Sequence, residues 1–241
     1  MIRLLIQAME NFQLNLSRLK GKIVAIDGPA GSGKSTTSRM LAARLGYVYL
    51  DTGAMYRALT YFSLKNNIDI SDETKLEVLA KKLSFEFITE NEVNRVFING
   101  EEVTEEIRTM EVTKNVSEVS AHKGVREAMV FKQKEIGKNG SVVAEGRDTT
   151  TVVFPKADLK IYLDATVEER AQRRLLELSK KGVSTTLEEQ KQDILRRDRY
   201  DSNREHSPLQ KSKDAIMVDT TNLTIEGQVD HIISLMKSII N

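Results

Sequence analysis

Residues 28–35, Gly-Pro-Ala-Gly-Ser-Gly-Lys-Ser, constrain this chain more than any other stretch, because they fit the phosphate-binding loop pattern G-x-x-x-x-G-K-[ST] at every fixed position. The apolar run 23–27 before them predicts a buried strand. Residues 36–45 after them predict a helix that Gly46 can end. Glycines let the backbone direct several N–H groups at one anion, and the N-terminus of a helix adds its positive dipole end. The stretch therefore predicts a binding site for a nucleoside triphosphate.

Two side chains of this loop carry chemistry. Lys34 can reach the β- and γ-phosphates, and the hydroxyl of Ser35 can bind Mg²⁺. The alternative is a chance glycine-rich turn with a stray lysine, but that would not explain the strand and the helix on either side. The loop does not by itself indicate which molecule receives the phosphoryl group.

The rest of the chain alternates between strand and helix patterns. Apolar runs predict five core strands, at residues 23–27, 47–50, 141–144, 159–164 and 215–219. Since helical patterns separate these strands, we expect an α/β fold with a mostly parallel five-stranded sheet flanked by helices. Residues 84–104 instead form short runs around the hairpin signal Asn99-Gly100, which predicts a small antiparallel sheet inserted into this fold.

Basic residues gather in the second half of the chain. Seven arginines fall between positions 170 and 204: Arg170, Arg173, Arg174, Arg196, Arg197, Arg199 and Arg204. Capping-box patterns at Thr166-x-x-Glu169 and Thr186-x-x-Glu189 predict two helices here, with a mobile turn at Lys180-Lys181-Gly182 between them. Arginines stabilise the charge that develops in phosphoryl transfer, so these residues predict a helical lid over the phosphates. A solvated helical surface with i,i+4 ion pairs is the alternative.

Composition narrows the class of protein. The net charge of +1 gives no reason to expect bulk attraction to nucleic acid or membranes, and no apolar run is long enough to cross a bilayer. An RNA-binding surface would also need aromatic residues interleaved with the arginines. Residues 1–20 read as a short amphipathic extension rather than a signal peptide, so we expect one domain at residues 21–241. The absence of cysteine excludes disulfides and fits a cytoplasmic location.

The sequence offers no evident general base beside the phosphate loop. A kinase that acts on a sugar hydroxyl needs an aspartate to accept a proton, whereas a phosphate acceptor is already anionic near neutral pH. Many arginines without an evident base therefore favour a phosphate group as the acceptor.

Five motifs occur in order along the chain. They are residues 26–35, residues 50–57 (Leu-Asp-Thr-Gly-Ala-Met-Tyr-Arg), Glu106-Ile107-Arg108-Thr109, Gly146-Arg147-Asp148 with residues 151–155, and Arg197-Asp198 with residues 201–204. Together they resemble the bacterial cytidylate kinases of the nucleoside monophosphate kinase family, from about Lys22 to the end of the chain. The resemblance implies transfer of the γ-phosphoryl group of ATP to CMP or dCMP by a monomer that binds neither nucleic acid nor membrane. It also implies a monophosphate-binding lobe at about residues 55–138 and a lid at about residues 168–200.

The resemblance assigns roles residue by residue. ATP would be held by Gly28, Pro29, Ala30, Gly31, Ser32, Gly33, Lys34, Ser35 and Thr36, with Mg²⁺ on Ser35. The acceptor would be bordered by Thr52, Tyr56 and Arg57, with its cytosine on Ser117, Arg126 and Asp148, its phosphate on Arg147 and Arg204, and its sugar on Arg197 and Asp201. The catalytic residues implied are Lys34, Arg147, Arg174, Arg197 and Arg204.

Two features depart from the family pattern. About twenty residues precede the first core strand, where the family usually has only a few. Thr149-Thr150 follows Asp148 where the family commonly has an apolar residue and then glycine, and threonine adopts positive φ less readily than glycine. A P-loop kinase for another small acceptor, such as UMP or shikimate, stays an alternative. A regulatory nucleotide switch is disfavoured, because the guanine-reading Asn-Lys-x-Asp pattern does not occur.

Overall fold

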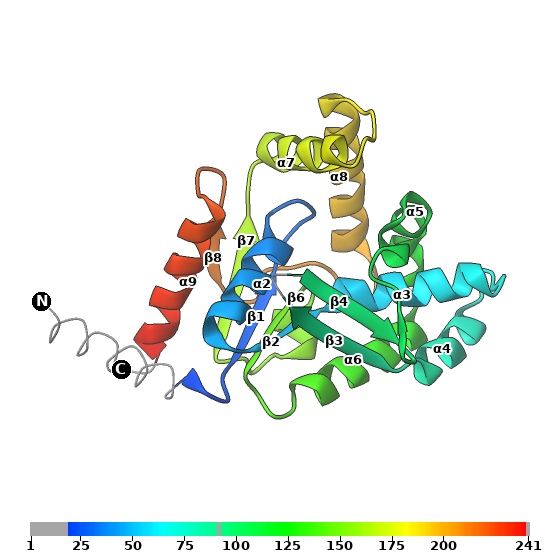
Figure 1. The fold of residues 1–241 in the computed structure, drawn as a ribbon, viewed down its shortest axis with the longest axis horizontal. Coiled ribbons are helices and arrows are strands. Elements are labelled where there is room, and N and C mark those ends of the chain that lie inside the picture. The colour runs from blue at the N-terminus through cyan, green and yellow to red at the C-terminus, as the bar shows by residue number, and fades with distance from the viewer. Residues whose placement is uncertain (1–18, 91–92, 240–241) are drawn as a thin grey trace, which may run out of the picture.

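A five-stranded parallel sheet forms the centre of the structure, a computed structural model that describes residues 19–90 and 93–239 (Figure 1). Its strand order is β2-β6-β1-β7-β8, and neighbouring strands pair in parallel. The strands are β1 (Ile23–Asp27), β2 (Val48–Asp51), β6 (Val142–Gly146), β7 (Leu159–Asp164) and β8 (Ile216–Asp219). The predicted α/β class is confirmed. In such sheets, ligands bind beyond the carboxyl ends of the strands.

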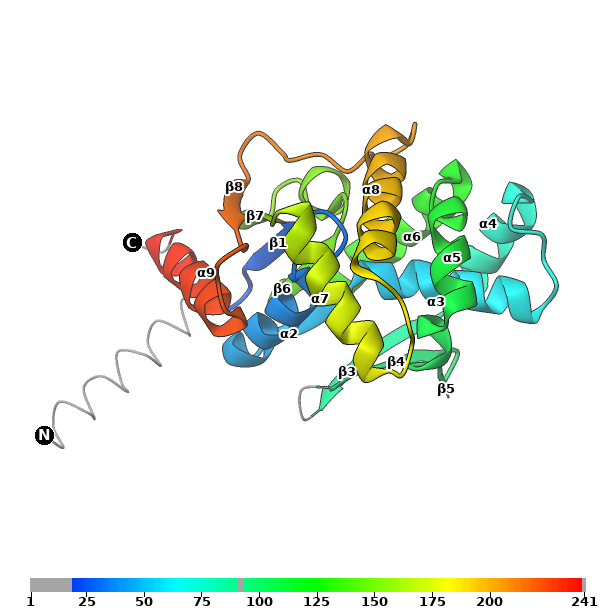
Figure 2. The ribbon, with the colours of Figure 1, turned by 90° about the horizontal axis from the view of Figure 1, so that it is seen from above.

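Helices cover both faces of this sheet. They are α2 (Lys34–Leu45), α3 (Thr52–Lys65), α4 (Glu73–Lys82), α5 (Met110–Val119), α6 (Lys123–Gly137), α7 (Val167–Lys180), α8 (Leu187–Asn203) and α9 (Ile225–Ile239). Val24 and Ile26 of β1 pack with α2 and α9, which lie side by side in both ribbon views (Figures 1 and 2). Ala25 belongs to the opposite cluster with α3 and α6, as the alternation of side chains along a strand requires. No helix in the described ranges is long and apolar enough to span a membrane.

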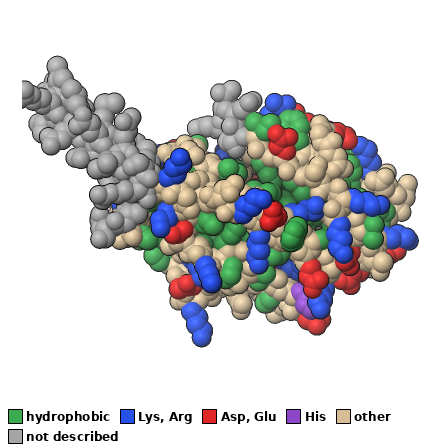
Figure 3. Space-filling model, turned by 90° about the horizontal axis from the view of Figure 1, so that it is seen from below, with side chains coloured by type: hydrophobic (Ala, Val, Ile, Leu, Met, Phe, Trp, Pro, Cys, Tyr) green, Lys and Arg blue, Asp and Glu red, His purple; other side chains and the backbone are tan. Residues whose placement is uncertain are grey.

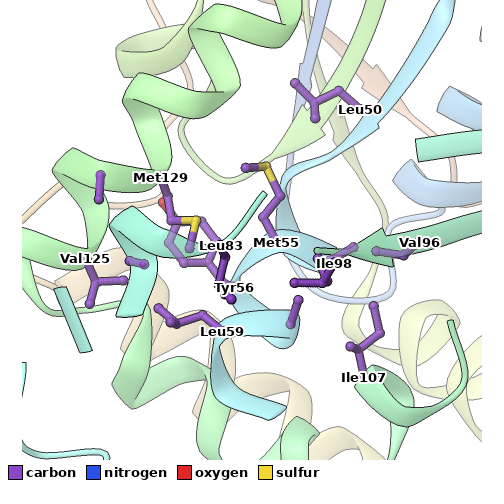
Figure 4. Packing of buried hydrophobic residues seen from close by; sticks show 14 of the residues in the cluster. Leu50, Met55, Tyr56, Leu59, Leu83, Val96, Ile98, Ile107, Val125 and Met129 are labelled. Atoms are coloured by element: carbon purple, nitrogen blue, oxygen red, sulfur yellow. The ribbon is translucent and has the colours of Figure 1, made fainter. Parts of the chain in front are cut away.

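Between β2 and β6 the chain builds an insert lobe, by which we mean helices α3 to α6 and the strands between them. Its small sheet contains β3 (Phe85–Glu90), β4 (Val93–Ile98) and β5 (Glu101–Glu102) and is antiparallel, as predicted. Asn99 and Gly100 make the predicted hairpin turn with φ of 52° and 83°. Figure 4 shows the apolar interior that joins α3, the small sheet and α6, formed by residues such as Met55, Leu59, Val96, Ile98, Val125 and Met129.

Helices α7 and α8 pack against each other as a hairpin above α2 in Figure 1. The predicted capping box at the start of α8 is complete, with reciprocal bonds between Thr186 and Glu189 of 3.2 Å and 2.8 Å. At the start of α7 only one of the two hydrogen bonds of the predicted capping box forms, so that prediction is wrong for the other. Thr166 accepts from the N–H of Glu169 at 3.3 Å, but the Glu169 carboxylate pairs with Arg173 at 2.9 Å instead. A charged donor one turn along outcompetes a neutral backbone N–H.

The start of the described chain already belongs to the core. Leu19 is buried with Val24 and Leu41, so packing begins before Gly21. Residues 1–18 of the predicted extension lie outside the described residues. Figure 3 shows basic and acidic side chains interspersed over one face of the molecule, in keeping with the net charge of +1.

Candidate active site

The glycines of the phosphate loop hold a backbone that other residues adopt poorly. Gly28, Gly31 and Gly33 have φ of 153°, 77° and 92°. A Cβ on Gly28 would stand 2.0 Å from the carbonyl oxygen of Leu163, so this position also requires the absence of a side chain. The loop leads directly into α2 at Lys34, which places the N-terminal N–H groups of that helix at the carboxyl edge of the sheet.

Lys34 is folded back into the loop and buried. Its ammonium group donates to the carbonyl of Pro29 at 2.7 Å and to the hydroxyl of Ser32 at 3.3 Å. Burial, followed by the positive charge of Arg147, lowers the pKa of Lys34 to about 7, although Glu145 and other carboxylates oppose the shift. An anion in the loop would reverse this balance, because it would stabilise the charged form.

Glu145 on β6 and Asp51 on β2 lie side by side at the carboxyl edge of the sheet. Glu145 is buried and accepts from the Tyr49 hydroxyl at 2.8 Å and from the hydroxyl of Ser35. Burial and then the charge of Asp51 raise the pKa of Glu145. The hydroxyl predicted to bind Mg²⁺ therefore lies against a carboxylate.

Asp51 also fixes the first turn of α3 over this edge. One carboxylate oxygen accepts from the N–H of Ala54 at 2.8 Å, and the other pairs with Arg57 at 2.9 Å. The hydroxyl of Thr52 donates to the carbonyl of Glu145 at 2.7 Å. Of the two residues predicted from sequence, Thr52 is thus held against β6 and Arg57 against the end of β2.

Three buried or half-buried arginines gather around one carboxylate. Arg147 donates through Nε to Asp201 at 2.8 Å, and Arg204 donates through Nε to the carbonyl of Ser207 at 2.6 Å. Among the described residues, Nε of Arg197 has no hydrogen-bond partner, and burial and the charge of Arg147 lower the pKa of Arg197. Burial works against ionisation of Asp201, but Arg147, Arg204 and Arg197 together outweigh it, and the pKa of Asp201 is lowered. The group carries an excess of positive charge that a bound phosphate would balance.

A second charged group lies further into the insert lobe. Arg126 and Asp148 form a hydrogen-bonded ion pair, with only 3 % and 4 % of each residue exposed. Arg126 also donates to the carbonyl of Ser120 at 3.0 Å and lies 5.2 Å from the centre of the Tyr56 ring. Arg204 Nη2 is 3.8 Å from the other oxygen of Asp148. Polar groups and an aromatic face are therefore concentrated in one place.

Thr149 and Thr150 have a role that sequence reasoning missed. They begin the π-helical turn η2 (Thr149–Val153), and Thr150 does not adopt positive φ. The N–H and hydroxyl of Thr149 donate to one oxygen of Asp27 at 2.8 Å and 2.7 Å, and those of Thr150 donate to the other at 2.8 Å and 2.6 Å. Burial raises the pKa of Asp27, and the four hydrogen bonds oppose that rise. The turn after Arg147 and Asp148 is thereby tied to the residue that precedes the phosphate loop.

Arg170 and Asp198 join helices α7 and α8 to the same loop. Arg170 is buried, donates to the carbonyls of Ala30 and Ala165 at 3.0 Å each, and pairs with Asp198. Asp198 accepts from the N–H of Ala30 at 3.1 Å. The backbone of Ala30 is thus held through both its N–H and its carbonyl. The sequence placed Arg170 in the lid but gave no signal for this contact.

One cavity of about 860 Å³ connects these groups. Gly28 and Pro29 do not line it, whereas the other predicted site residues do: Ala30, Gly31, Ser32, Gly33, Lys34, Ser35, Thr36, Thr52, Tyr56, Arg57, Ser117, Arg126, Arg147, Asp148, Arg174, Arg197, Asp201 and Arg204. Arg174 pairs at its rim with Glu177 at 2.8 Å. Arg108 lines the cavity as well, although its motif had suggested no role. A site with an anion-binding loop at one side and arginines at the other has the charges needed to hold two phosphate-bearing molecules.

Comparison with known proteins agrees with this geometry. The sequence model of the cytidylate kinase family matches residues 24–238. The chain is 53 % identical over 218 residues to a cytidylate kinase of Enterococcus faecalis, covering 90 % of this chain and 96 % of that protein. It is 50 % identical over 213 residues to one of Bacillus cytotoxicus (88 % and 95 % covered) and 48 % identical over 214 residues to one of Bacillus subtilis (89 % and 96 % covered). The chain therefore belongs to the cytidylate kinase family.

Proposed function

We propose that the protein transfers the γ-phosphoryl group of ATP to CMP or dCMP, giving ADP and CDP or dCDP. The observation that carries this proposal is the shared cavity, in which the phosphate loop faces Arg147, Arg197 and Arg204 while the Arg126–Asp148 pair lies beyond them. A donor triphosphate and an acceptor monophosphate would meet between these groups. Phosphoryl transfer depends chiefly on such positioning and on charge stabilisation.

On the donor side, the N–H groups of the phosphate loop and the start of α2 would bind the ATP phosphates. Lys34 would leave its bonds to Pro29 and Ser32 and follow the negative charge of the transferring group. The hydroxyl of Ser35 beside Glu145 fits a magnesium site, since Mg²⁺ takes few protein ligands and several phosphate oxygens and waters. The ion would supply charge neutralisation between the phosphates.

On the acceptor side, the arginine group is suited to the monophosphate. Arg147 and Arg204 would contact its oxygens, with Arg57 at the border of the site, while Arg197 and Asp201 would approach the sugar. Arg174 would join from the lid. No general base is required, because the attacking phosphate oxygen is already anionic near neutral pH.

The base would be read by Asp148 and Arg126, with Ser117 alongside. Cytosine offers an amino donor beside two acceptors, whereas uracil offers a carbonyl and an N–H in the first two of these positions. Asp148 can accept from the cytosine amine, and Arg126 can donate to the acceptors. These two side chains hold each other in the structure, so the base would share their charges rather than meet isolated ions.

The experiment that tests this proposal is an ADP-release assay with ATP and Mg²⁺ across CMP, dCMP, UMP, AMP, GMP and shikimate. We expect CMP and dCMP to be converted with higher kcat/KM than UMP. Faster turnover of UMP or of shikimate than of CMP would replace the proposed acceptor with the alternative kinase function. The monomeric state and the cytoplasmic location expected from the sequence stay predictions, and size-exclusion chromatography with light scattering measures the first.

A further inference from the structure

A second cavity, of about 780 Å³, lies outside the site described above. We call it the α8 groove. One wall is α8, and the other is formed by Glu73 of α4 and by residues 121–123 at the junction of α5 and α6. Residues Arg204, Glu205 and His206 after α8 complete it. Arg204 lines both cavities, so the two sites share one side chain.

Helix α8 presents different residues to the two cavities. Gln192, Leu195, Arg196, Arg199, Tyr200 and Asn203 line the groove. Their spacing of three and four residues forms one stripe along the helix. Ile194, Arg197 and Asp201 line the active-site cavity from the opposite stripe. A ligand that packs on the groove-lining stripe therefore contacts the same helix that positions Ile194, Arg197 and Asp201 in the active-site cavity.

The charges of the groove favour an anion. Lys123, Arg196, Arg199 and Arg204 bring four positive charges, against the two carboxylates Glu73 and Glu205. Glu73 accepts through one oxygen from the N–H of Gly124 at 2.8 Å, and its other oxygen lies 4.0 Å from Nδ1 of His122. Arg196 pairs with Asp193 at 2.6 Å. Within the described residues, Lys123 and Arg199 are exposed, and their side chains make neither an ion pair nor a hydrogen bond. Two free cations facing one hollow can bind a phosphate group.

The groove also offers apolar surface beside these cations. Leu195 is 42 % exposed and Tyr200 is 41 % exposed, and both line the groove. They border Arg196 and Arg199 on the same stripe. A flat ring can lie on such a surface while its charged group meets the guanidinium groups.

We infer that the α8 groove is a second ligand site, for small phosphorylated molecules that carry an aromatic ring. Its occupancy is linked to the acceptor site through α8 and Arg204. Binding in the groove does not depend on the proposed function, whereas the linkage to CMP does. Linkage is reciprocal: if a groove ligand changes the affinity for CMP by some factor, CMP changes the affinity for that ligand by the same factor.

The test uses phenyl phosphate as the probe and the full-length chain with its active site saturated with ADP and CMP. Isothermal titration calorimetry should give one binding event per chain, weakened at least about tenfold in Lys123→Glu/Arg199→Glu because charged contacts are lost. The matched control is Lys114→Glu/Lys134→Glu, which reverses two exposed lysines on α5 and α6 that line neither cavity. This control should bind the probe as the wild type does.

Two further titrations show whether the phosphate group or the ring of the probe accounts for its binding. Inorganic phosphate should bind more weakly than phenyl phosphate, since it lacks the ring, and benzyl alcohol should not bind. Both double variants should keep the wild-type turnover of CMP, so a loss of probe binding cannot be due to misfolding. Absence of probe binding to the saturated protein would overturn the inference. So would equal binding to the wild type and Lys123→Glu/Arg199→Glu, which would place the probe outside the α8 groove.

Discussion

Thr150 donates two hydrogen bonds to one carboxylate oxygen of Asp27, from its N–H at 2.8 Å and from its hydroxyl at 2.6 Å. Both residues are buried, and Thr150 stands where the family commonly has glycine. A glycine would supply only the first of these bonds. The threonine hydroxyl therefore adds a direct contact between the turn after β6 and the residue before the phosphate loop.

Thr150→Val should lower the free energy of unfolding by about 1–3 kcal/mol, because it leaves a buried carboxylate oxygen with one donor fewer. Chemical denaturation monitored by circular dichroism measures this. Thr151→Val is the matched control, since the Thr151 hydroxyl makes only a 3.4 Å contact with the carbonyl of Asp148. Equal losses for the two variants would mean that the Asp27 contact adds nothing specific.

Lys34→Ala should leave the fold intact and reduce kcat by about two orders of magnitude or more, because the ammonium group meets charge that moves in the transition state. The melting temperature should not fall, since the wild-type ammonium is buried at the expense of its hydration. Steady-state kinetics and thermal unfolding together check this. A folded variant with wild-type turnover would remove Lys34 from the mechanism.

Binding of ATP near pH 8 should take up protons through Lys34. Its pKa of about 7 leaves most of it neutral in the free protein, and the phosphates would raise that value. Calorimetry in buffers of different ionisation enthalpy measures the uptake, which Lys34→Met should abolish. Because the native pKa lies below the ordinary 10.5, the unfolded chain binds more protons between about pH 7 and 10.5. The contribution of Lys34 to stability therefore rises with pH across that window and is constant outside it.

Asp148→Asn should lower kcat/KM for CMP and narrow the ratio of CMP to UMP, because an amide can turn a donor toward the uracil carbonyl. Each mismatched buried group is expected to cost roughly 1–3 kcal/mol. The variant also weakens the pair with Arg126, so protein stability is measured in parallel. If both substrates slow by the same factor, Asp148 positions Arg126 and does not read the base.

The backbone amides of the predicted lid should differ in their protection from hydrogen exchange. Hydrogen exchange near Lys180-Lys181-Gly182 should be fast without ligands and slow with ATP analogue and CMP bound, because Lys181 lines the cavity. Residues near Arg170 should be protected in both states, since Arg170 is already bound to Ala30. Equal protection of residues 180–182 in the free and doubly liganded protein would contradict a closing lid.

Features that depend on residues close together in the sequence could be predicted, whereas features that depend on residues far apart along the chain could not. The strand, loop and helix around Lys34 were predictable because their periodicities and glycines are local. The bonds from Thr150 to Asp27 span 123 residues and exist only because β1 and β6 are neighbours in the sheet. The alternation pattern predicts strands, but it does not fix their order to this precision.

The same limit applies to side chains with a choice of partner. Glu169 fits a capping box in sequence but pairs with Arg173, and Asp148 fits a base-reading carboxylate but already holds Arg126. The family motifs predicted that the site arginines lie close together. Their individual partners depend on burial and on competition among many charges, which a linear pattern does not contain.

The contact between Arg170 and the phosphate loop restricts how this sequence can diverge. A Cβ at Gly31 would stand 3.1 Å from both the Cβ and the carbonyl oxygen of Arg170, so the size limit at position 31 comes partly from α7. Ala30 contributes only its backbone to Arg170 and Asp198, but it is buried, so its side chain has to stay small. Descendants of this chain should therefore change Arg170 and Asp198 together, but keep glycine at position 31 whatever residue stands at position 170, because the backbone carbonyl of residue 170 is also 3.1 Å away and Gly31 has φ of 77°.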